Sequence, residues 1–182
     1  MNEERLWAPW RLEYVAGNES TAELAPEPAE WLPGADRSCF LCRAGANFEP
    51  AASQDHRLLV VERAAYAVVV LNRYPYNNGH LLIAPRRHVG DLSEMTSDEH
   101  IECIEQLAKL TRVYRKCLNA EGFNIGLNLG RVAGAGLPGH LHWHFVPRWA
   151  GDNNFMPVLA GTRVIPQSLE ALWELLVGAL NQ

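Results

Sequence analysis

The chain has 182 residues, of which 48% are hydrophobic and 20% are charged, so it is long enough for one globular domain with a core. Its net charge of -5, without a block of Lys or Arg, argues against non-specific nucleic-acid binding, which needs clustered basic residues. No apolar stretch approaches the roughly 20 residues of a membrane helix, and the first residues lack the apolar core of a secretory signal. We therefore expect a cytoplasmic protein that binds neither nucleic acid nor membranes.

The chain is expected to have three parts. Residues 1–38 contain an aromatic segment, RLWAPWRLEYV at 5–15, and an extended connection rich in Pro, Ala, Gly and Glu. The aromatic segment carries too much apolar surface to lack a partner, so we expect it to pack on the domain or on another subunit. Residues 39–150 are expected to form the compact domain, and residues 151–182 a C-terminal extension that ends in a helix.

Short apolar runs rich in Val, Ile and Leu are predicted strands: RLLVVE at 57–62, YAVVVLN at 66–72 and GHLLIAP at 79–85. The segment NRYPYNNG supplies Pro and Asn-Gly turn chemistry between the last two, so these two strands are expected to be antiparallel neighbours. FNIGLN at 123–128 and GHLHWHFVPRW at 139–149 are the remaining predicted strands.

Two helices are predicted. The first begins after Thr96, which has Glu99 at capping-box spacing, and Gly122 is its expected stop. Its expected buried stripe is Ile101, Ile104, Leu107, Ala108, Tyr114 and Leu118. The second starts near Ser168, with an apolar side formed by Leu169, Leu172, Trp173, Leu176 and Val177. Strands mixed with two helices, without βαβ alternation, predict an α+β fold in which an antiparallel sheet packs with one long helix and a C-terminal helix.

Three histidines, His140, His142 and His144, occupy every second position of an apolar run. In a strand, side chains alternate between faces, so successive histidines would lie roughly 7 Å apart on one face. The interleaved residues are then expected to face the core: Leu141, Trp143 and Phe145. Three imidazoles in register favour a functional site over a polar surface strand. The spacing leaves open whether they bind a metal, catalyse a reaction, or do both.

The loop LGRVAGAGLPG at 129–139 leads directly into these histidines. Its glycine density lets backbone N–H groups approach an anion, although a plain flexible loop is the alternative. The loop matches neither the phosphate loop ending in Gly-Lys-Ser/Thr nor a dinucleotide fingerprint. Because no carboxylate cluster for magnesium is evident, any phosphoryl chemistry would depend on imidazole and backbone dipoles.

The segment CFLC at 39–42 places two cysteines at zinc-binding spacing. Zinc would need two more ligands, for which histidine is the usual complement. A redox role is the competing interpretation, but the pair does not follow a strand and open a helix as a thioredoxin-like site would. Cys103 and Cys117 fall on one face of the first predicted helix and are expected to be small core residues.

Two segments together resemble a known family. HLHWHFVP at 140–147 fits the His-x-His-x-His-x-x signature of the histidine triad (HIT) family, and LNRYPYNNGHLLIAPRRH at 71–88 is similar to its other hallmark segment. The resemblance covers about residues 39–150. LWAPWRLEYV at 6–15 and HFVPRWAGDNNF at 144–155 are similar to the bacterial branch that includes diadenosine tetraphosphate phosphorylases.

The resemblance implies a HIT-like fold and a nucleotidyl transferase or hydrolase that cleaves dinucleoside polyphosphates, with phosphorolysis of diadenosine tetraphosphate favoured. It implies that His142 attacks the α-phosphorus to form a covalent nucleotidyl-histidine, that His144 contacts the phosphate, and that His80 is a fourth histidine beside the triad. Neutral imidazole is nucleophilic near pH 7, and its phosphoramidate product is reactive enough to pass to inorganic phosphate or water.

Residues around the triad complete the expected nucleotide site. The resemblance places Asn72 near the ribose and Asn128 near the phosphates. Many family members carry Gln or Ser in the turn before the triad, whereas this turn reads GAGLPG, so the N–H groups of Gly134 or Gly136 are expected to replace part of that contact. Arg148 is expected to supply positive charge, with a salt bridge at the rim as an open alternative.

The resemblance also implies a structural zinc held by Cys39, Cys42, His88 and His140. Such a closed set leaves no open position for substrate. No organic cofactor is expected. Family members usually form homodimers, so we expect a homodimer here.

Three other functions remain open. A hydrolase of adenosine phosphoramidates or aminoacyl adenylates would use the same site. A zinc-dependent hydrolase would use His140 and His142 as a metal-binding pair with an activated water. A nucleotide sensor would bind its ligand without covalent chemistry.

Overall fold

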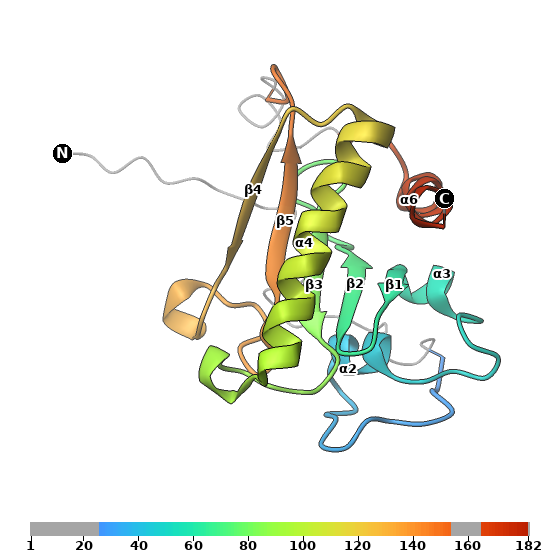
Figure 1. Ribbon diagram of the computed structural model, residues 1–182, viewed down its shortest axis with the longest axis vertical. Coiled ribbons are helices and arrows are strands. Elements are labelled where there is room, and N and C mark those ends of the chain that lie inside the picture. Colours follow the sequence, from blue (N-terminus) through green and yellow to red (C-terminus); the bar gives the residue numbers. More distant parts are fainter. Residues whose placement is uncertain (1–25, 154–164, 182) are drawn as a thin grey trace.

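A five-stranded antiparallel sheet forms the centre of the molecule (Figure 1). The computed structural model describes residues 26–153 and 165–181, so the aromatic segment at 5–15 lies outside the described residues. The strands are β1 (Val60–Arg63), β2 (Ala67–Leu71), β3 (Leu81–Pro85), β4 (Gly122–Leu127) and β5 (Trp143–Arg148). The helices are α2 (Phe40–Gly45), α3 (Asp55–Leu58), α4 (Ser97–Leu118) and α6 (Leu169–Leu180), with short 3-10 helices η3 (Leu92–Glu94) and η4 (Arg131–Ala133). The predicted α+β fold is confirmed.

The sheet order is β1-β2-β3-β5-β4, and each neighbouring pair is antiparallel. β2 and β3 pair along their whole length, which confirms the prediction that they are antiparallel neighbours. Directly opposed residues point to the same face of a sheet. Val70, Leu82 and His144 lie opposite one another across β2, β3 and β5, so they share one face.

The long helix α4 covers the opposite face. It packs against β2, β3 and α6, and Figure 1 shows it running across the sheet. The Tyr114 ring contacts the ring of Phe145 edge-on, with centroids 5.1 Å apart. Because Phe145 adjoins His144 on β5, alternation turns the His144 side chain away from α4. The face that α4 does not cover is therefore the face that carries His144.

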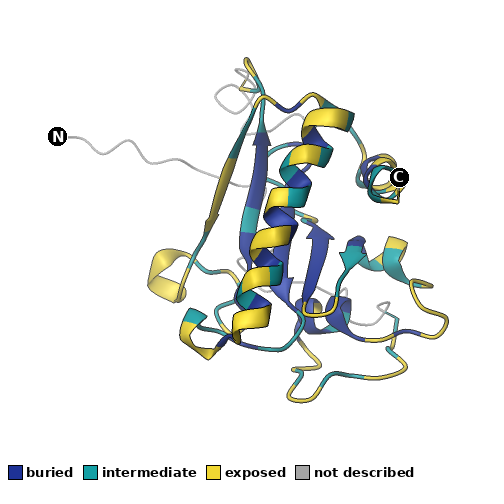
Figure 2. Cartoon of the chain, in the orientation of Figure 1, coloured by how far each residue is buried: buried dark blue, intermediate teal, exposed yellow. Residues whose placement is uncertain are grey.

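The predicted buried stripe of α4 was wrong at three positions. Ile101 is 56% exposed, Ile104 is 55% exposed, and Ala108 is also exposed. The side of α4 that faces the sheet carries Cys103, Gln106, Leu107, Leu110 and Tyr114. The helix therefore has two apolar stripes at helical spacing, and periodicity alone does not tell which one meets the sheet. Figure 2 shows the outward side of α4 as exposed.

Three element boundaries also differ from the predictions. α4 ends at Leu118, because Asn119 adopts the left-handed conformation, and Gly122 begins β4 instead of stopping the helix. The predicted strand at 57–62 begins only at Val60, because residues 55–58 form α3 and Leu59 is left-handed with φ of 57°. The predicted histidine strand begins at Trp143, so residues 139–142 precede the sheet ladder.

The C-terminal helix α6 agrees with its prediction. Ser168 caps it by accepting a hydrogen bond from the N–H of Ala171, and Leu172 and Leu176 are buried. The indole N–H of Trp173 donates to the carbonyl of Val60 at 2.7 Å, which fastens α6 to β1. Among the helices of the described ranges, none has the length and apolar character needed to cross a membrane.

The capping box of α4 should contribute measurably to stability. The Thr96 side chain accepts from the N–H of Glu99, and the Glu99 carboxylate accepts from the N–H of Thr96 at 2.8 Å. Thr96→Ala is expected to lower the free energy of unfolding by about 1 kcal/mol, which corresponds to a thermal midpoint about 2–4 °C lower. The matched control is Thr111→Ala at a partly exposed position in the interior of the same helix, which should leave the midpoint unchanged or slightly higher because Ala favours helix. Equal midpoint losses in the two variants would argue against a capping role for Thr96.

Candidate functional site

Two cysteines and two histidines from distant parts of the chain meet beside α2. The ligand atoms of Cys39, Cys42, His88 and His140 all lie within 4.8 Å of one another. The Cys42 sulfur lies 3.1 Å from Nδ1 of His88, and Nδ1 of His140 lies 3.3 Å from the Cys39 sulfur. Ligand atoms around tetrahedral zinc are separated by about 3.3–3.8 Å, so the cluster has the composition and spacing of a Cys2His2 site. The structure brings together all four predicted ligands.

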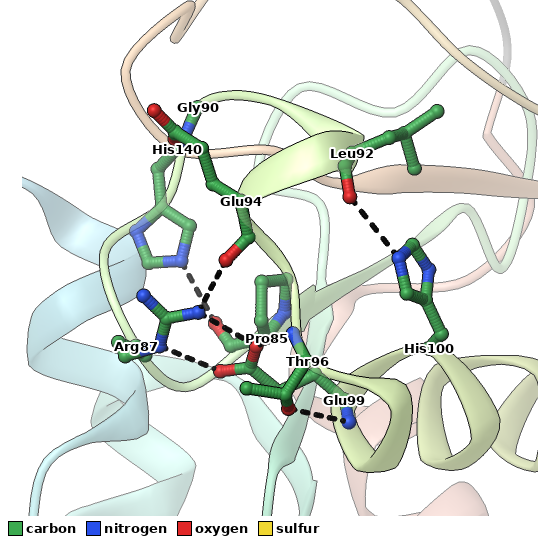
Figure 3. Close-up of polar contacts among 9 residues, drawn as sticks. All are labelled: Pro85, Arg87, Gly90, Leu92, Glu94, Thr96, Glu99, His100 and His140. Carbon is green, nitrogen blue, oxygen red and sulfur yellow. Dashed lines mark hydrogen bonds and ion pairs between the residues drawn. The ribbon is translucent and has the colours of Figure 1, made fainter.

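The hydrogen bonds of His140 orient it for ligation. Its Nε2–H donates to the carbonyl of Pro85 at 2.8 Å, as Figure 3 shows, and this leaves the lone pair on Nδ1, which points to the cysteines. An imidazole that binds a metal through one nitrogen usually donates its other N–H to such an acceptor. His140 is fully buried. The donor set therefore fits a metal ion without rearrangement of this ring.

The two cysteines shift each other's pKa in opposite directions. Interaction with Cys42, together with burial, raises the pKa of the Cys39 thiol to about 12, and interaction with Cys39 lowers the pKa of Cys42. The raised pKa favours the Cys39 thiol with its proton bound. Metal binding would release that proton, because thiolate is the form that binds a metal. The other two cysteines lie apart from this pair, with Cys103 buried and Cys117 packed against the core, as predicted.

His142 follows the cluster directly and is held in one tautomer. Its Nδ1–H donates to the backbone carbonyl of His140 at 2.8 Å, so the lone pair is on Nε2. Its side chain is buried, and this burial lowers its pKa, which favours the neutral imidazole. A neutral ring with a fixed lone pair has the form required of a nucleophile.

His144 and His80 form a second connected pair. The N–H of Tyr76 donates to Nδ1 of His80 at 3.0 Å, so the proton of neutral His80 is on Nε2. This proton is donated to Nδ1 of His144 at 3.0 Å, which places the His144 proton on its own Nε2. The rings of His142 and His144 lie edge-on with centroids 5.1 Å apart. The predicted fourth histidine is therefore brought into contact with the triad.

Tyr76 was not predicted as a site residue. Its ring stacks on His80 with centroids 4.7 Å apart and lies 5.5 Å from the ring of His144. A signal was available in the sequence, because Tyr76 lies four residues before His80 within the quoted hallmark segment. The carbonyl of Pro85 was missed as well, since a backbone acceptor leaves no signature in residue types.

Of the predicted nucleotide-binding residues, Asn72 contacts one of these histidines, and the others lie in neighbouring segments of the chain. The Asn72 amide lies 3.3 Å from Nδ1 of His80, and its oxygen accepts from the N–H of Tyr74 at 2.9 Å. Asn128 directly follows Leu127, the partner of Trp143, so it lies beside the end of β5 nearest the triad. Gly134 and Gly136 are exposed in the loop before the triad, and Gly134 has φ of 88°, a conformation that favours glycine.

Arg148 lies at the other end of β5. It is four residues from His144, which corresponds to about 13 Å along a strand. Its guanidinium contacts both carboxylate oxygens of Asp152, at 2.6 and 2.8 Å, and the Asn124 side chain at 2.9 Å. Arg148 thus forms a salt bridge at the rim, which was the alternative to its supplying positive charge to the nucleotide site. The Asn77 amide donates to the same carboxylate at 2.8 Å, which connects this ion pair to the turn that carries His80.

The ion pair predicts a pH-dependent contribution to stability. The hydrogen bond from Arg148 is the main reason that the pKa of Asp152 falls from 3.8 to about 2. A carboxyl group with a lowered pKa stabilises the folded state above its unfolded pKa, and this contribution is lost as the pH falls through the folded value. In chemical denaturation, the stability difference between the wild type and Asp152→Asn should therefore be constant above about pH 5 and shrink progressively between about pH 5 and 2. A difference that stays constant down to pH 2 would contradict this role of the carboxylate.

Comparison with known proteins agrees with this geometry. A family model for the HIT domain matches residues 54–151. AP-4-A phosphorylase from Mycobacterium tuberculosis is 40% identical over 166 residues, which cover 91% of this chain and 78% of that protein. The asymmetrical bis(5'-nucleosyl)-tetraphosphatase of Schizosaccharomyces pombe is 32% identical over 93 residues, covering 51% of this chain and 50% of that protein.

A solved structure also resembles this chain. It is a zinc-bound histidine triad family protein from Mycobacterium smegmatis, with a TM-score of 0.56 and 28% identity over 68% of this chain and 84% of that one. The family match covers more than half of the chain, and it includes the histidine triad and the antiparallel sheet that presents it. The chain therefore belongs to the HIT domain family.

Proposed function

We propose that this protein is an enzyme that cleaves dinucleoside polyphosphates through a nucleotidyl group carried covalently on His142. The observation that carries the proposal is the fixed tautomer of His142: its Nδ1–H is bonded to the His140 carbonyl, so the lone pair on Nε2 is the nucleophile. The similarity to AP-4-A phosphorylase and to bis(5'-nucleosyl)-tetraphosphatase supports the substrate class.

The proposed reaction has two displacement steps. With diadenosine tetraphosphate, Nε2 of His142 bonds to the α-phosphorus, and the bond from that phosphorus to the bridging oxygen breaks. ATP leaves with the bridging oxygen, and adenylyl-His142 remains. An oxygen of inorganic phosphate or water then bonds to the same phosphorus, the P–N bond breaks, and the acceptor loses its proton to solvent. Phosphate yields ADP, whereas water yields AMP, and His142 is restored in both cases.

Neighbouring residues have proposed roles in binding. With its proton on Nε2, His144 would donate to a phosphate oxygen, and His80 would hold it in that tautomer. Asn72 would contact the ribose, Asn128 the phosphates, and the N–H groups of Gly134 and Gly136 the bridging region. A contact from Arg148 would require its guanidinium to leave Asp152.

Inorganic phosphate is the proposed acceptor, and a product assay tests it. The protein is incubated with diadenosine tetraphosphate in the presence and absence of phosphate, and the nucleotides are separated by anion-exchange chromatography. We expect ADP and ATP when phosphate is present. AMP and ATP alone, at an unchanged rate with phosphate, would show hydrolysis instead, and the absence of cleavage would refute the substrate class.

Adenosine phosphoramidates and aminoacyl adenylates are alternative substrates, because the same attack on an α-phosphorus would cleave them. Measuring kcat/KM for each compound beside diadenosine tetraphosphate distinguishes the cases. The proposal predicts the higher value for the dinucleoside polyphosphate.

We further propose that Cys39, Cys42, His88 and His140 hold a structural zinc ion. Zinc bound there would supply a cross-link between segments, not a catalytic water, since a closed four-ligand site has no open position. In a zinc hydrolase His140 and His142 would share the metal, but Nδ1 of His140 faces the two sulfurs and Nδ1–H of His142 bonds a carbonyl. Metal analysis with X-ray absorption should find two sulfur ligands per zinc. A coordination shell without sulfur would favour the zinc hydrolase.

A cytoplasmic location is also inferred, because the proposed zinc site requires reduced thiols.

A homodimer is the proposed assembly, built on a catalytic domain of residues 39–150. β4 is an edge strand of the sheet among the described residues, and its Ile125 is 45% exposed. Together with the exposed Ile101 and Ile104 of α4, this edge offers both backbone pairing and apolar burial to a second copy. Light scattering should give twice the monomer mass, and Ile104→Glu should reduce it to the monomer mass. Monomer mass for the unaltered protein would refute this assembly.

A further inference from the structure

We propose that the Cys39, Cys42, His88 and His140 centre positions the nucleophile: metal ligation of His140 would fix the backbone carbonyl that holds the His142 ring. This inference rests on the proposed function and on the proposed metal site. It assigns to the centre a role in the covalent step, in addition to its contribution to stability.

His140 connects the metal cluster with the nucleophile: its ring faces the cysteines, and its backbone carbonyl bonds His142. Its Nδ1 lies 3.3 Å from the Cys39 sulfur and 3.5 Å from the Cys42 sulfur, and its Nε2–H donates to the Pro85 carbonyl at 2.8 Å. Its own carbonyl accepts from Nδ1–H of His142 at 2.8 Å. Any rotation of the His140 peptide group would therefore move the acceptor that selects the tautomer and direction of the nucleophile.

The sheet does not fix this peptide group. β5 begins at Trp143, so residues 140–142 have no ladder partners in the register of β5 with β3 and β4. Their attachment is to the segment that carries His88, because the N–H of Leu141 donates to the Val89 carbonyl at 2.7 Å. The orientation of His142 thus depends on how the two ligand-bearing segments are joined.

These two segments also pack backbone against backbone. A Cβ on Gly90 would lie 3.0 Å from the carbonyl oxygen of Pro138, and a Cβ on Gly139 would lie 3.3 Å from Nε2 of His88. The first of these contacts leaves no space for a side chain without a backbone shift. A small movement of one segment is therefore transmitted to the other.

The His88 side has a further anchor that needs no metal. Arg87 contacts both carboxylate oxygens of Glu99, at 2.9 and 2.8 Å, and donates to the carbonyl of Glu94 at 2.7 Å (Figure 3). Glu99 is buried and belongs to the capping box of α4. The segment after β3 is thereby fastened to the long helix. On the other segment, the N–H of His140 donates to the Leu137 carbonyl at 3.2 Å, within its own loop, and its ring donates to the Pro85 carbonyl. Metal ligation would add a bond from the His140 ring to the segments that carry the cysteines and His88.

The test compares zinc-loaded, chelated and reloaded protein. The first measurement is the rate of adenylyl-His142 formation from diadenosine tetraphosphate, by rapid quench and mass spectrometry. The second, which needs no substrate, is the ¹⁵N NMR spectrum of histidine-labelled protein, in which protonated and unprotonated Nδ1 differ. We expect the loaded protein to show His142 as a single Nδ1–H tautomer. We expect the chelated protein to show mixed tautomers and a roughly 10–100-fold slower covalent step, both restored by zinc.

A variant keeps the inference testable if the chelated protein does not stay folded. Gly90→Ala retains all four ligands but forces the segment before His140 to shift away from the new methyl group. Its matched control is Gly178→Ala in α6, where an added Cβ meets nothing within 4 Å. In the zinc-loaded state, Gly90→Ala should slow adduct formation and alter the His142 signals, whereas Gly178→Ala should do neither.

The outcomes separate this inference from the proposed function. If chelated protein and Gly90→Ala match the loaded wild type in adduct rate within twofold and in His142 tautomer, the positioning role is overturned and the covalent mechanism stands. If the loaded wild type forms no adduct at all, the proposed function itself fails.

Discussion

The His142→Ala variant is expected to lower kcat/KM for diadenosine tetraphosphate by roughly 10⁴-fold or more, because loss of the proposed covalent nucleophile removes the whole proposed reaction path. His142 is the histidine whose Nδ1–H is occupied by a backbone carbonyl and whose Nε2 retains the lone pair. Replacement by Ala leaves no group in that position. The effect is measured as steady-state cleavage by chromatography, with binding of the intact substrate followed by calorimetry.

A second histidine variant controls for nonspecific effects. His100→Ala removes an imidazole of α4 that donates to the Leu92 carbonyl (Figure 3). It should retain cleavage within a few-fold of the wild type. Near-normal cleavage by folded His142→Ala would rule out His142 as the nucleophile.

Removal of the proposed zinc ion is expected to produce the largest change in stability. A ligand that binds only the folded state, at a thousandfold excess over its dissociation constant, stabilises that state by about 4 kcal/mol. Each kcal/mol shifts the thermal midpoint of a chain of this size by about 2–4 °C. Chelation, or Cys42→Ala, should therefore lower the midpoint by roughly 8–16 °C and abolish stoichiometric zinc.

Cys117→Ala is the matched control for this experiment. Cys117 is a free thiol that lies outside the metal cluster, partly exposed on α4. Zinc content should remain at one ion per chain and the midpoint should change by no more than a few degrees. Unchanged midpoints after complete zinc removal, verified by metal analysis, would contradict a structural role for the cluster.

Much of the fold was predictable, because several elements carry local signals that packing does not override. The capping box at Thr96 and the cap at Ser168 are short-range contacts, and both helices begin where these residues predict. The Pro and Asn-Gly chemistry of the 72–79 turn likewise predicted the pairing of β2 with β3. Such features depend on neighbouring residues only.

The buried stripe of α4 could not be predicted in the same way. Ile101 and Ile104 have helical spacing and apolar character, yet they are exposed, while Cys103 and Leu110 face the sheet. Which stripe is buried depends on how the helix crosses the sheet, and on whether a second copy of the chain covers the other stripe. Neither is encoded in a local period.

At the candidate site, the family resemblance predicted the cluster residues correctly, whereas the alternation of the histidines did not predict the backbone around them. Cys39, Cys42, His88 and His140 were named in advance and are brought together. The alternation of the histidines nevertheless suggested one continuous strand, whereas the N–H of Leu141 bonds Val89 and the ladder starts at Trp143. A backbone hydrogen bond between residues far apart in sequence has no residue-type signature, so this departure was not predictable.

Mass spectrometry of the protein after brief exposure to substrate tests the central proposal most directly. Zinc-loaded protein is mixed with diadenosine tetraphosphate without phosphate, quenched within milliseconds to seconds at alkaline pH, and digested for peptide mapping. We predict an adenylyl group on the peptide that contains residues 140–148, localised to His142 by fragmentation and missing from His142→Ala. Cleavage of the substrate at a normal rate with no adduct, or with an adduct on a residue other than His142, would contradict the proposed mechanism.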